Sequence, residues 1–149
     1  MTERNKKLLL DDLAKRLGND VKMGDNRGHI GTLKIIDHIH NTIGFKTTNM
    51  YGEDSVLIKG RIDFWKPYLR PMQSMTKVEK KEISELIDAP IEIDSDGDII
   101  YLGGYSIIPC SDYQIYIDYL ISHHFDFRGL IPMGLAIEAP EGMYKINTK

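Results

Sequence analysis

The stretch that decides the fold is residues 31–65, whose sequence is GTLKIIDHIHNTIGFKTTNMYGEDSVLIKGRIDFW. It is rich in β-branched residues, and glycine and asparagine interrupt it, which is typical of short strands joined by tight turns. We predict strands over Gly31–His40, Thr42–Asn49 and Val56–Trp65. Strands at this spacing indicate a small curved antiparallel sheet or a partial barrel.

Helices are expected on both sides of this stretch. The segment Thr2–Leu17 repeats leucine at helical spacing, and Gly18 follows as a stop. Thr76 with Glu79 forms a capping box, which predicts a second helix running to Asp88.

The last third of the chain alternates between β and α patterns. Ile91–Ile108 is predicted to form a hairpin whose tip is the acidic run Asp94–Asp98. Ser111 with Gln114 repeats the capping-box pattern and predicts a third helix through about His124. Leu130–Tyr144 contains two prolines and two glycines, so we expect an irregular C-terminal tail.

Composition places the chain among globular α+β proteins. Its 149 residues and 17.1 kDa suit one domain over residues 1–149, with a substructure that divides it into 1–72 (helix plus β-rich part) and 73–149 (helix, hairpin, helix, tail). Cys110 is the only cysteine, and the longest uncharged run is too short to span a bilayer, so we expect a cytoplasmic protein without a membrane segment.

The segment between the strands and the second helix is the first candidate site. Its aromatic and cationic residues alternate and could stack bases or receive a peptide, and core filling is the structural alternative. The candidate binding residues are Trp65, Lys66, Tyr68 and Arg70. Pro67 and Pro71 lack the donor that a central strand requires, so we predict an extended connector here.

Histidines form the second candidate site. His38 and His40 would point to one face of a strand and could ligate a metal, although two polar residues on the solvent side of an edge strand are the simpler interpretation. His123 or His124 with Asp126 has the logic of acid–base catalysis, whereas histidines in a last helical turn also complement the helix dipole.

Two further features have simpler explanations. The acidic tip Asp94–Asp98 lacks the glycine and glutamate positions of a calcium loop, so we interpret it as an Asp-Gly hairpin turn. Cys110 precedes a predicted helix without a nearby base, so we interpret it as a small buried thiol.

Charge is distributed unevenly along the chain. Residues 1–70 carry 13 Lys+Arg against 9 Asp+Glu, whereas residues 71–149 carry 6 against 13. A basic first half favours contact with nucleic acid, although the total charge of −3 does not.

Five strings of the sequence are distinctive: KPYLRPM at 66–72, SMT at 74–76, HHFDFRGLI at 123–131, GLA at 134–136 and APEGMY at 139–144. In this order they resemble a large family of uncharacterised proteins from gut Bacteroidales and their bacteriophages and prophages. The resemblance implies a small protein of a mobile element in the bacterial host cytoplasm that binds a host or phage macromolecule, such as a defence component. It supplies no catalytic residue.

We therefore expect a non-enzymatic module that binds a macromolecule, with a protein as first partner and no cofactor. Two alternatives stay open: a metal-assisted or His/Asp-dependent hydrolase, and a weak binder of single-stranded nucleic acid.

Overall fold

The computed structural model describes residues 1–48, 54–88, 91–95, 99–101 and 110–146. The chain divides into two compact units, which we call unit 1 (Met1–Leu69 with Leu130–Ile137) and unit 2 (Arg70–Gly129 with Glu138–Lys149). The described residues contain three α-helices and an open six-stranded sheet, so the predicted α+β class is confirmed. None of the described helices is long and apolar enough to cross a membrane.

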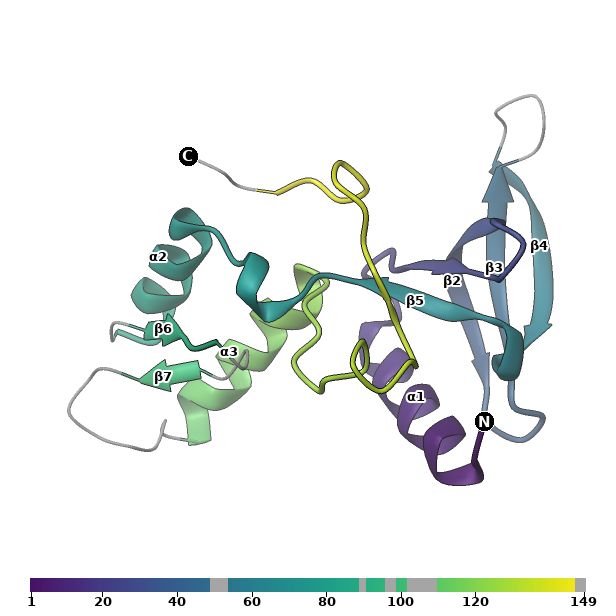
Figure 1. Cartoon of the computed structure of the whole chain (residues 1–149), viewed down its shortest axis with the longest axis horizontal. Helices are drawn as coiled ribbons and strands as arrows, with labels where there is room; N and C mark the ends of the chain where they lie inside the picture. The colour runs from purple at the N-terminus through teal and green to yellow at the C-terminus, as the bar shows by residue number, and fades with distance from the viewer. Residues whose placement is uncertain (49–53, 89–90, 96–98, 102–109, 147–149) are drawn as a thin grey trace. The chain divides into compact units, whose positions relative to one another are not determined.

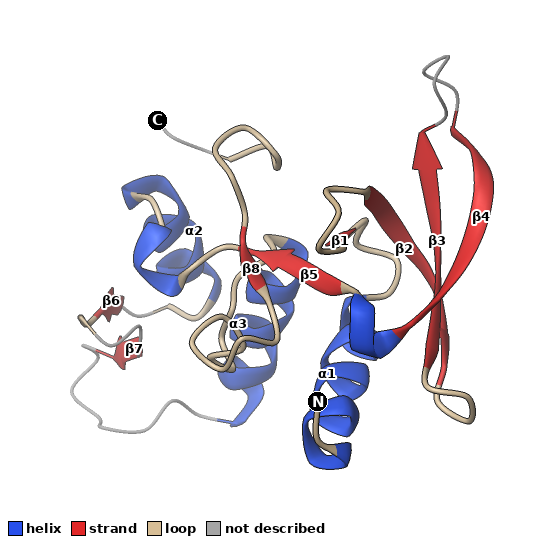
Figure 2. Ribbon diagram, turned by 45° about the vertical axis from the view of Figure 1, so that its right-hand side comes forward, coloured by secondary structure: helices blue, strands red, loops and turns tan. Residues whose placement is uncertain are grey.

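Unit 1 is built on the six-stranded sheet, in the order β4-β3-β2-β1-β5-β8 (Figure 1, and Figure 2 for β1 and β8). Its strands are β1 (Lys22–Gly24), β2 (Ile30–Asp37), β3 (Thr42–Thr48), β4 (Asp54–Arg61), β5 (Lys66–Leu69) and β8 (Ile137–Glu138). Neighbouring strands from β4 to β5 pair antiparallel. Figure 2 shows that the hairpin of β3 and β4 curves, as expected for a small curved sheet.

Helix α1 (Glu3–Arg16) contributes to the core of unit 1. Thr2 caps it by accepting a hydrogen bond from the Asn5 amide, and Gly18 follows with φ +91°. Its leucines Leu9, Leu10 and Leu13 belong to one apolar core with side chains of the strands and their connections. Among these are Val21, Met23, Leu33, Ile43, Phe45 and Trp65. The periodicity thus identified the buried leucines, except Leu17, which is exposed.

An ion pair within α1 is also buried, which the leucine pattern did not indicate. The Arg16 Nε donates to Asp12 Oδ2 at 2.7 Å, and both side chains are almost inaccessible to water. A spacing of four residues lets the two side chains meet on one helical face, so each charge meets its partner inside the core.

Strand β2, which corresponds to the first predicted strand (Gly31–His40), is shorter than predicted. It ends at Asp37, and residues 38–41 form a turn. The Asp37 carboxylate accepts hydrogen bonds from the amides of Ile39 and His40, which stops the strand with a local Asx turn. His38 and His40 are therefore turn residues, and the prediction that they share a strand face is wrong.

The third predicted strand also ends early, and the prediction of a connector after it is wrong. Strand β4 stops at Arg61, and a 3₁₀ turn, η1 (Ile62–Phe64), follows. Strand β5 then places Pro67 inside the sheet, between β1 and β8. A strand of four residues has few ladder bonds, so one missing donor is tolerated there.

Unit 2 combines two helices with a hairpin. It comprises η2 (Met72–Ser74), α2 (Lys77–Leu86), β6 (Ile91–Ile93), β7 (Ile99–Tyr101) and α3 (Cys110–Ser122). The predicted hairpin is confirmed over Ile91–Ile93 and Ile99–Tyr101, which pair antiparallel, while residues 96–98 of its tip and 102–108 of its predicted second strand lie outside the described residues. A second apolar core joins these elements, with Met72, Met75, Ile83, Ile87, Ile91, Tyr116, Leu120 and Phe125 among its members.

The capping-box prediction is confirmed for α2 and not for α3. Thr76 and Glu79 form both reciprocal bonds of the box, although α2 ends at Leu86 rather than Asp88. Helix α3 already begins at Cys110, so Ser111 lies inside its first turn and is not the residue that precedes it.

Helix α3 ends two residues before the predicted position. His124 adopts a left-handed conformation with φ +65°. The Phe125 amide donates to the Leu120 carbonyl at 2.9 Å, and the His124 amide donates to the Ile121 carbonyl at 3.1 Å. This is the Schellman arrangement, which satisfies the last carbonyls of the helix, with histidine at the position where glycine is usual.

Candidate functional site

The four predicted binding residues fall in different environments. Trp65 is 9% exposed in the core of unit 1, where its ring centroid lies 3.9 Å from that of Phe45. Arg70 is 3% exposed in unit 2. Lys66 and Tyr68 are half-buried on β5. Core filling, the structural alternative, therefore describes Trp65, and only Lys66 and Tyr68 retain surface that a partner could touch.

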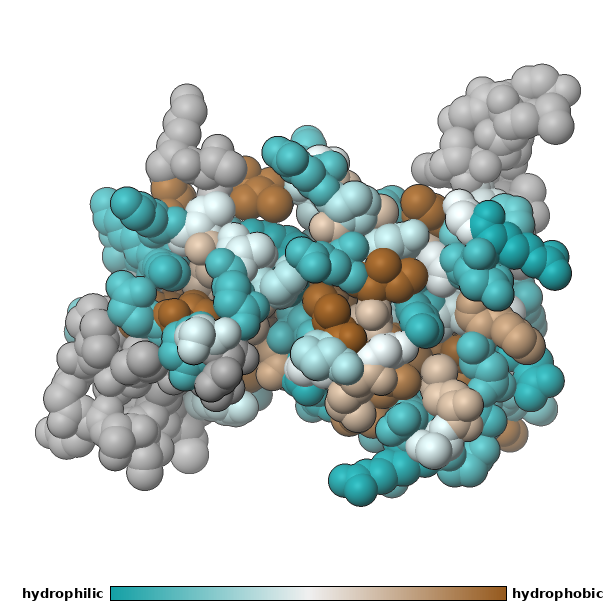
Figure 3. Space-filling model, viewed as in Figure 1, coloured by the Kyte–Doolittle hydropathy of each residue, from teal (hydrophilic) through white to brown (hydrophobic). Residues whose placement is uncertain are grey.

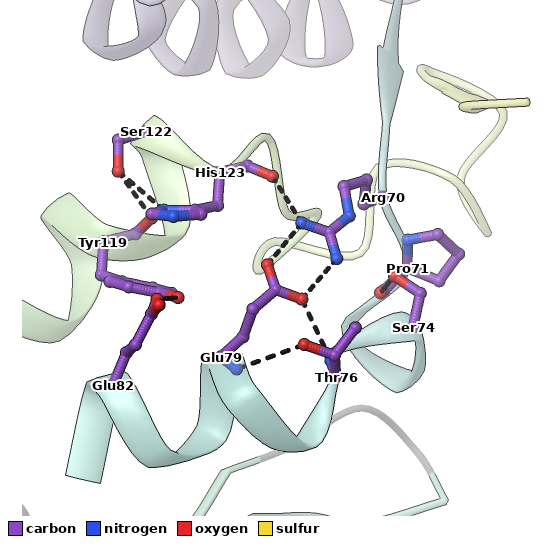
Figure 4. Close-up of polar contacts among 9 residues, drawn as sticks. All are labelled: Arg70, Pro71, Ser74, Thr76, Glu79, Glu82, Tyr119, Ser122 and His123. Carbon is purple, nitrogen blue, oxygen red and sulfur yellow. Dashed lines mark hydrogen bonds and ion pairs between the residues drawn. The ribbon is translucent and has the colours of Figure 1, made fainter. Parts of the chain in front are cut away.

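Arg70 is held by a buried polar network in unit 2 (Figure 4). Its guanidinium donates to both carboxylate oxygens of Glu79 at 2.7 Å and to the His123 carbonyl at 3.2 Å. The same Glu79 carboxylate accepts the Thr76 amide at 3.0 Å. The guanidinium also lies 4.1 Å from the ring centroid of Phe125. One carboxylate thus closes the capping box and pairs with a buried cation.

The electrostatics of Glu79 follow from these contacts. Burial alone raises the pKa of a carboxyl group, but the hydrogen bonds from Arg70 and Thr76 outweigh it and hold the pKa of Glu79 below its ordinary value. The carboxylate therefore stays ionised opposite the guanidinium. This is a structural role, since the pair has almost no accessible surface.

The C-terminal histidines do not form a common site with each other. The His123 ring stacks on Tyr119 at 3.9 Å between centroids, and its Nδ1 lies 2.9 Å from the Tyr119 carbonyl oxygen. The His124 ring stacks on Tyr144 at 3.7 Å. Asp126 is buried, and its amide donates to the Arg70 carbonyl. Each ring is thus occupied by a different aromatic neighbour.

Near these histidines, the pKa of the Tyr119 hydroxyl departs from its ordinary value. Its hydroxyl donates to Glu82 Oε2 at 2.5 Å (Figure 4). Burial and this bond to a carboxylate raise the pKa of Tyr119 above its ordinary value. The phenol therefore stays protonated, and its hydrogen bond to Glu82 links α3 to α2.

Two of the three N-terminal histidines, His29 and His40, each pair with a carboxylate in an exposed turn. The His40 Nδ1 lies 2.7 Å from Asp37 Oδ2, and the His29 Nδ1 lies 2.8 Å from Asp25 Oδ2. His38 is exposed in the same turn as His40. Within the described ranges, no three His, Cys, Asp or Glu side chains come close enough to hold a metal ion.

The sheet of unit 1 has a face that sequence reasoning missed, which we call the outer face. Side chains alternate along each strand, so Met23, Leu33 and Phe45 point into the core while their neighbours point away from it. Lys22 pairs with Thr32, and Thr32 pairs with Lys46, so these three residues form one row across β1, β2 and β3 on the outer face.

A β-bulge adds another cation to this row. The pairing register of β2 with β3 shifts between Leu33 and Ile35, which leaves Lys34 as the extra residue. Lys34 is exposed and lines one pocket with Asp20, Lys22, Thr32 and Lys46. The Lys22 Nζ donates to Thr32 Oγ1 at 2.7 Å, and the Lys34 Nζ lies 3.1 Å from Asp20 Oδ1.

Strand β4 extends the cationic character of the outer face. Lys59 pairs with Gly44, two residues from Lys46, so alternation places Lys59 on the same face, and Arg61 follows it. Among the described residues, the Lys46 and Lys59 side chains form no hydrogen bond or ion pair. In Figure 3, hydrophilic residues predominate at the right of the view, over the strands labelled β3 and β4 in Figure 1.

The outer face also includes Lys66 and Tyr68, the two candidate binding residues that keep accessible surface. Gly24 pairs with Lys66, which places Lys66 and Tyr68 on the same side as Lys22. The Tyr68 ring lies across Gly24, where a Cβ would come within 2.6 Å of it. Glycine is thus required here for the aromatic ring to lie against the sheet beside the lysine row.

Comparison with protein-family models, with curated proteins and with solved structures found no match. The assignment of function therefore depends on the geometry of the outer face and of the unit 2 network.

Proposed function

We propose that the protein is a non-enzymatic binding module and that the outer face of unit 1 binds single-stranded nucleic acid. The observation that carries the proposal is the gathering of Lys22, Lys34 and Lys46 around one pocket of an exposed sheet face. This choice ranks nucleic acid above the protein partner expected from the sequence, because a lysine row suits a repeating phosphate backbone.

The charge of unit 1 supports this ligand class. Its residues carry 12 Lys+Arg against 9 Asp+Glu, whereas those of unit 2 carry 7 against 13. Six cations of unit 1 are distributed across the outer face, from β4 to β5: Lys22, Lys34, Lys46, Lys59, Arg61 and Lys66. A local positive field attracts a polyanion even when the whole chain is acidic.

The shape of the face favours single-stranded nucleic acid over a duplex. Adjacent β-strands lie about 4.8 Å apart, so the row Lys22-Thr32-Lys46 spans about 10 Å and can follow a flexible phosphate backbone. Tyr68 beside it offers an aromatic surface for a base, which is accessible only when the base is unpaired. The role in a mobile element that the family resemblance implies is compatible with such a ligand.

The first prediction concerns the lysines. A triple variant, Lys22→Gln, Lys46→Gln and Lys59→Gln, should bind a labelled single-stranded oligonucleotide more weakly, because it removes phosphate contacts. Each lost contact lowers the slope of log affinity against log salt by about 0.7, so the slope should fall by about 2. Fluorescence anisotropy over a salt series measures both quantities.

A matched control separates local contacts from net charge. The variant Lys15→Gln, Lys77→Gln and Lys81→Gln removes the same charge from exposed positions on α1 and α2. It should retain most of the affinity and the steeper slope. Equal losses in the two variants, or binding to an acidic protein and to no oligonucleotide, would contradict the proposal.

A further inference from the structure

A second pocket of unit 1 adjoins the outer face. It is lined by Gly24, Asp25, Asn26, Asp63, Phe64 and Lys66, together with Ile137. Gly24 and Lys66 also belong to the outer face, where they pair across β1 and β5. A nucleic-acid strand that binds along the lysines can therefore continue into this pocket without leaving the surface of unit 1.

Phe64 gives the pocket an exposed aromatic ring on an anchored turn. It is 61% exposed, whereas its neighbours Ile62 and Trp65 are buried at 0% and 9%. The buried side chains hold the backbone of η1 on both sides of Phe64. The Arg61 guanidinium lies 5.9 Å from the Phe64 ring centroid, which adds a cation beside the ring. Such an aromatic ring is a stacking surface for a base.

Asp63 supplies a hydrogen-bond acceptor next to this ring. Its carboxylate is 20% exposed and is positioned by Lys6 Nζ at 3.4 Å and Arg61 Nη2 at 3.3 Å. A carboxylate has about four acceptor sites, so these two contacts leave capacity for a ligand. Because an ionised carboxylate accepts and does not donate, it matches an exocyclic amino group and not a carbonyl.

We propose that this pocket holds one nucleobase that bears an exocyclic amino group. The base stacks on Phe64, its amino group donates to Asp63, and Lys66 contacts the adjoining phosphate. The inference rests on the proposed function, because the outer face must first bind the strand. It adds selection among bases to a backbone contact that has none.

Two oligonucleotides whose bases differ at one edge test the inference. Oligo(dC) and oligo(dU) of about 12 nucleotides differ at C4, where cytosine has an amino group and uracil a carbonyl, and at the adjacent N3, which carries a proton only in uracil. The wild-type protein should bind oligo(dC) several-fold more tightly than oligo(dU). Phe64→Ala should weaken binding of oligo(dC) about tenfold, and Asp63→Asn should remove the preference for cytosine.

Controls keep the two proposals distinguishable. Tyr113→Ala removes another exposed aromatic ring, from α3 in unit 2, and should leave both affinities unchanged. If both oligonucleotides bind with a steep salt dependence but equally well, or if Phe64→Ala binds oligo(dC) as the wild type does, the base pocket is overturned and the proposed function stands. If neither binds at low salt, both are overturned.

Discussion

At the scale of single residues, burial separates the aromatic and cationic residues that lie close together in the sequence. Trp65 and Arg70 fill interiors, whereas Lys66 and Tyr68 lie on the outer face of unit 1. All four stand within six positions of the chain, so their composition alone does not distinguish them. Binding assays should therefore target Lys66, Tyr68 and the lysine row, because changes at Trp65 or Arg70 alter folding as well as recognition.

Glu79 is the residue whose replacement should damage unit 2 most. Glu79→Gln keeps the shape of the side chain but leaves the buried Arg70 guanidinium without its opposite charge. Breaking a buried pair costs about 3 kcal/mol, so the free energy of unfolding of unit 2 should fall by about that amount. Hydrogen exchange of the α2 amides measures the change.

The pH dependence of this effect has a defined sign. The pKa of Glu79 is lowered in the folded state, so its stabilisation is fully present above the unfolded value of 4.5 and is lost as pH falls through the folded pKa. The difference between wild type and Glu79→Gln should therefore shrink below about pH 4. As a control, Glu85→Gln, at an exposed pair with Lys81, should change stability by less than about 0.5 kcal/mol.

At the scale of elements, local side-chain caps explain some of the boundaries. Asp37 ends β2 through its own side chain, and Thr76 with Glu79 opens α2. The end of α3 depends instead on a backbone conformation at His124 that histidine seldom adopts. This explains why a sequence pattern placed the end of α3 too late.

The strain at His124 can be isolated by comparing two variants. His124→Gly and His124→Ala both lose the ring that stacks on Tyr144, and only alanine keeps a Cβ at φ +65°. We expect the glycine variant to be more stable than the alanine variant by up to about 1 kcal/mol. Urea unfolding followed by far-UV circular dichroism measures the difference, and a more stable alanine variant would contradict the assignment.

At the scale of the whole molecule, two separate apolar cores stabilise the chain. The core of unit 1 includes Leu13, and the core of unit 2 includes Ile83, both fully buried. We predict that Leu13→Ala and Ile83→Ala each cost about 2–5 kcal/mol, mainly in their own unit. Trp65, the only tryptophan, reports on unit 1, so its fluorescence transition should shift with Leu13→Ala and much less with Ile83→Ala.

Hydrogen exchange provides the complementary measurement for unit 2. Protection of the α2 and α3 amides should fall with Ile83→Ala. Equal shifts of the Trp65 transition in both variants would show instead that the two cores unfold as one.

The sequence by itself determined the features that depend on near neighbours. The capping box of α2, the hairpin from Ile91, the leucine face of α1 and the α+β class all arise from residues within a few positions of one another. Only the tertiary structure decided that Pro67 lies inside a sheet, that Arg70 is buried against Glu79, and that Lys22, Lys34 and Lys46 surround one pocket. Those features depend on strand pairing and side-chain burial between distant segments, and no local pattern of residues encodes which strands meet.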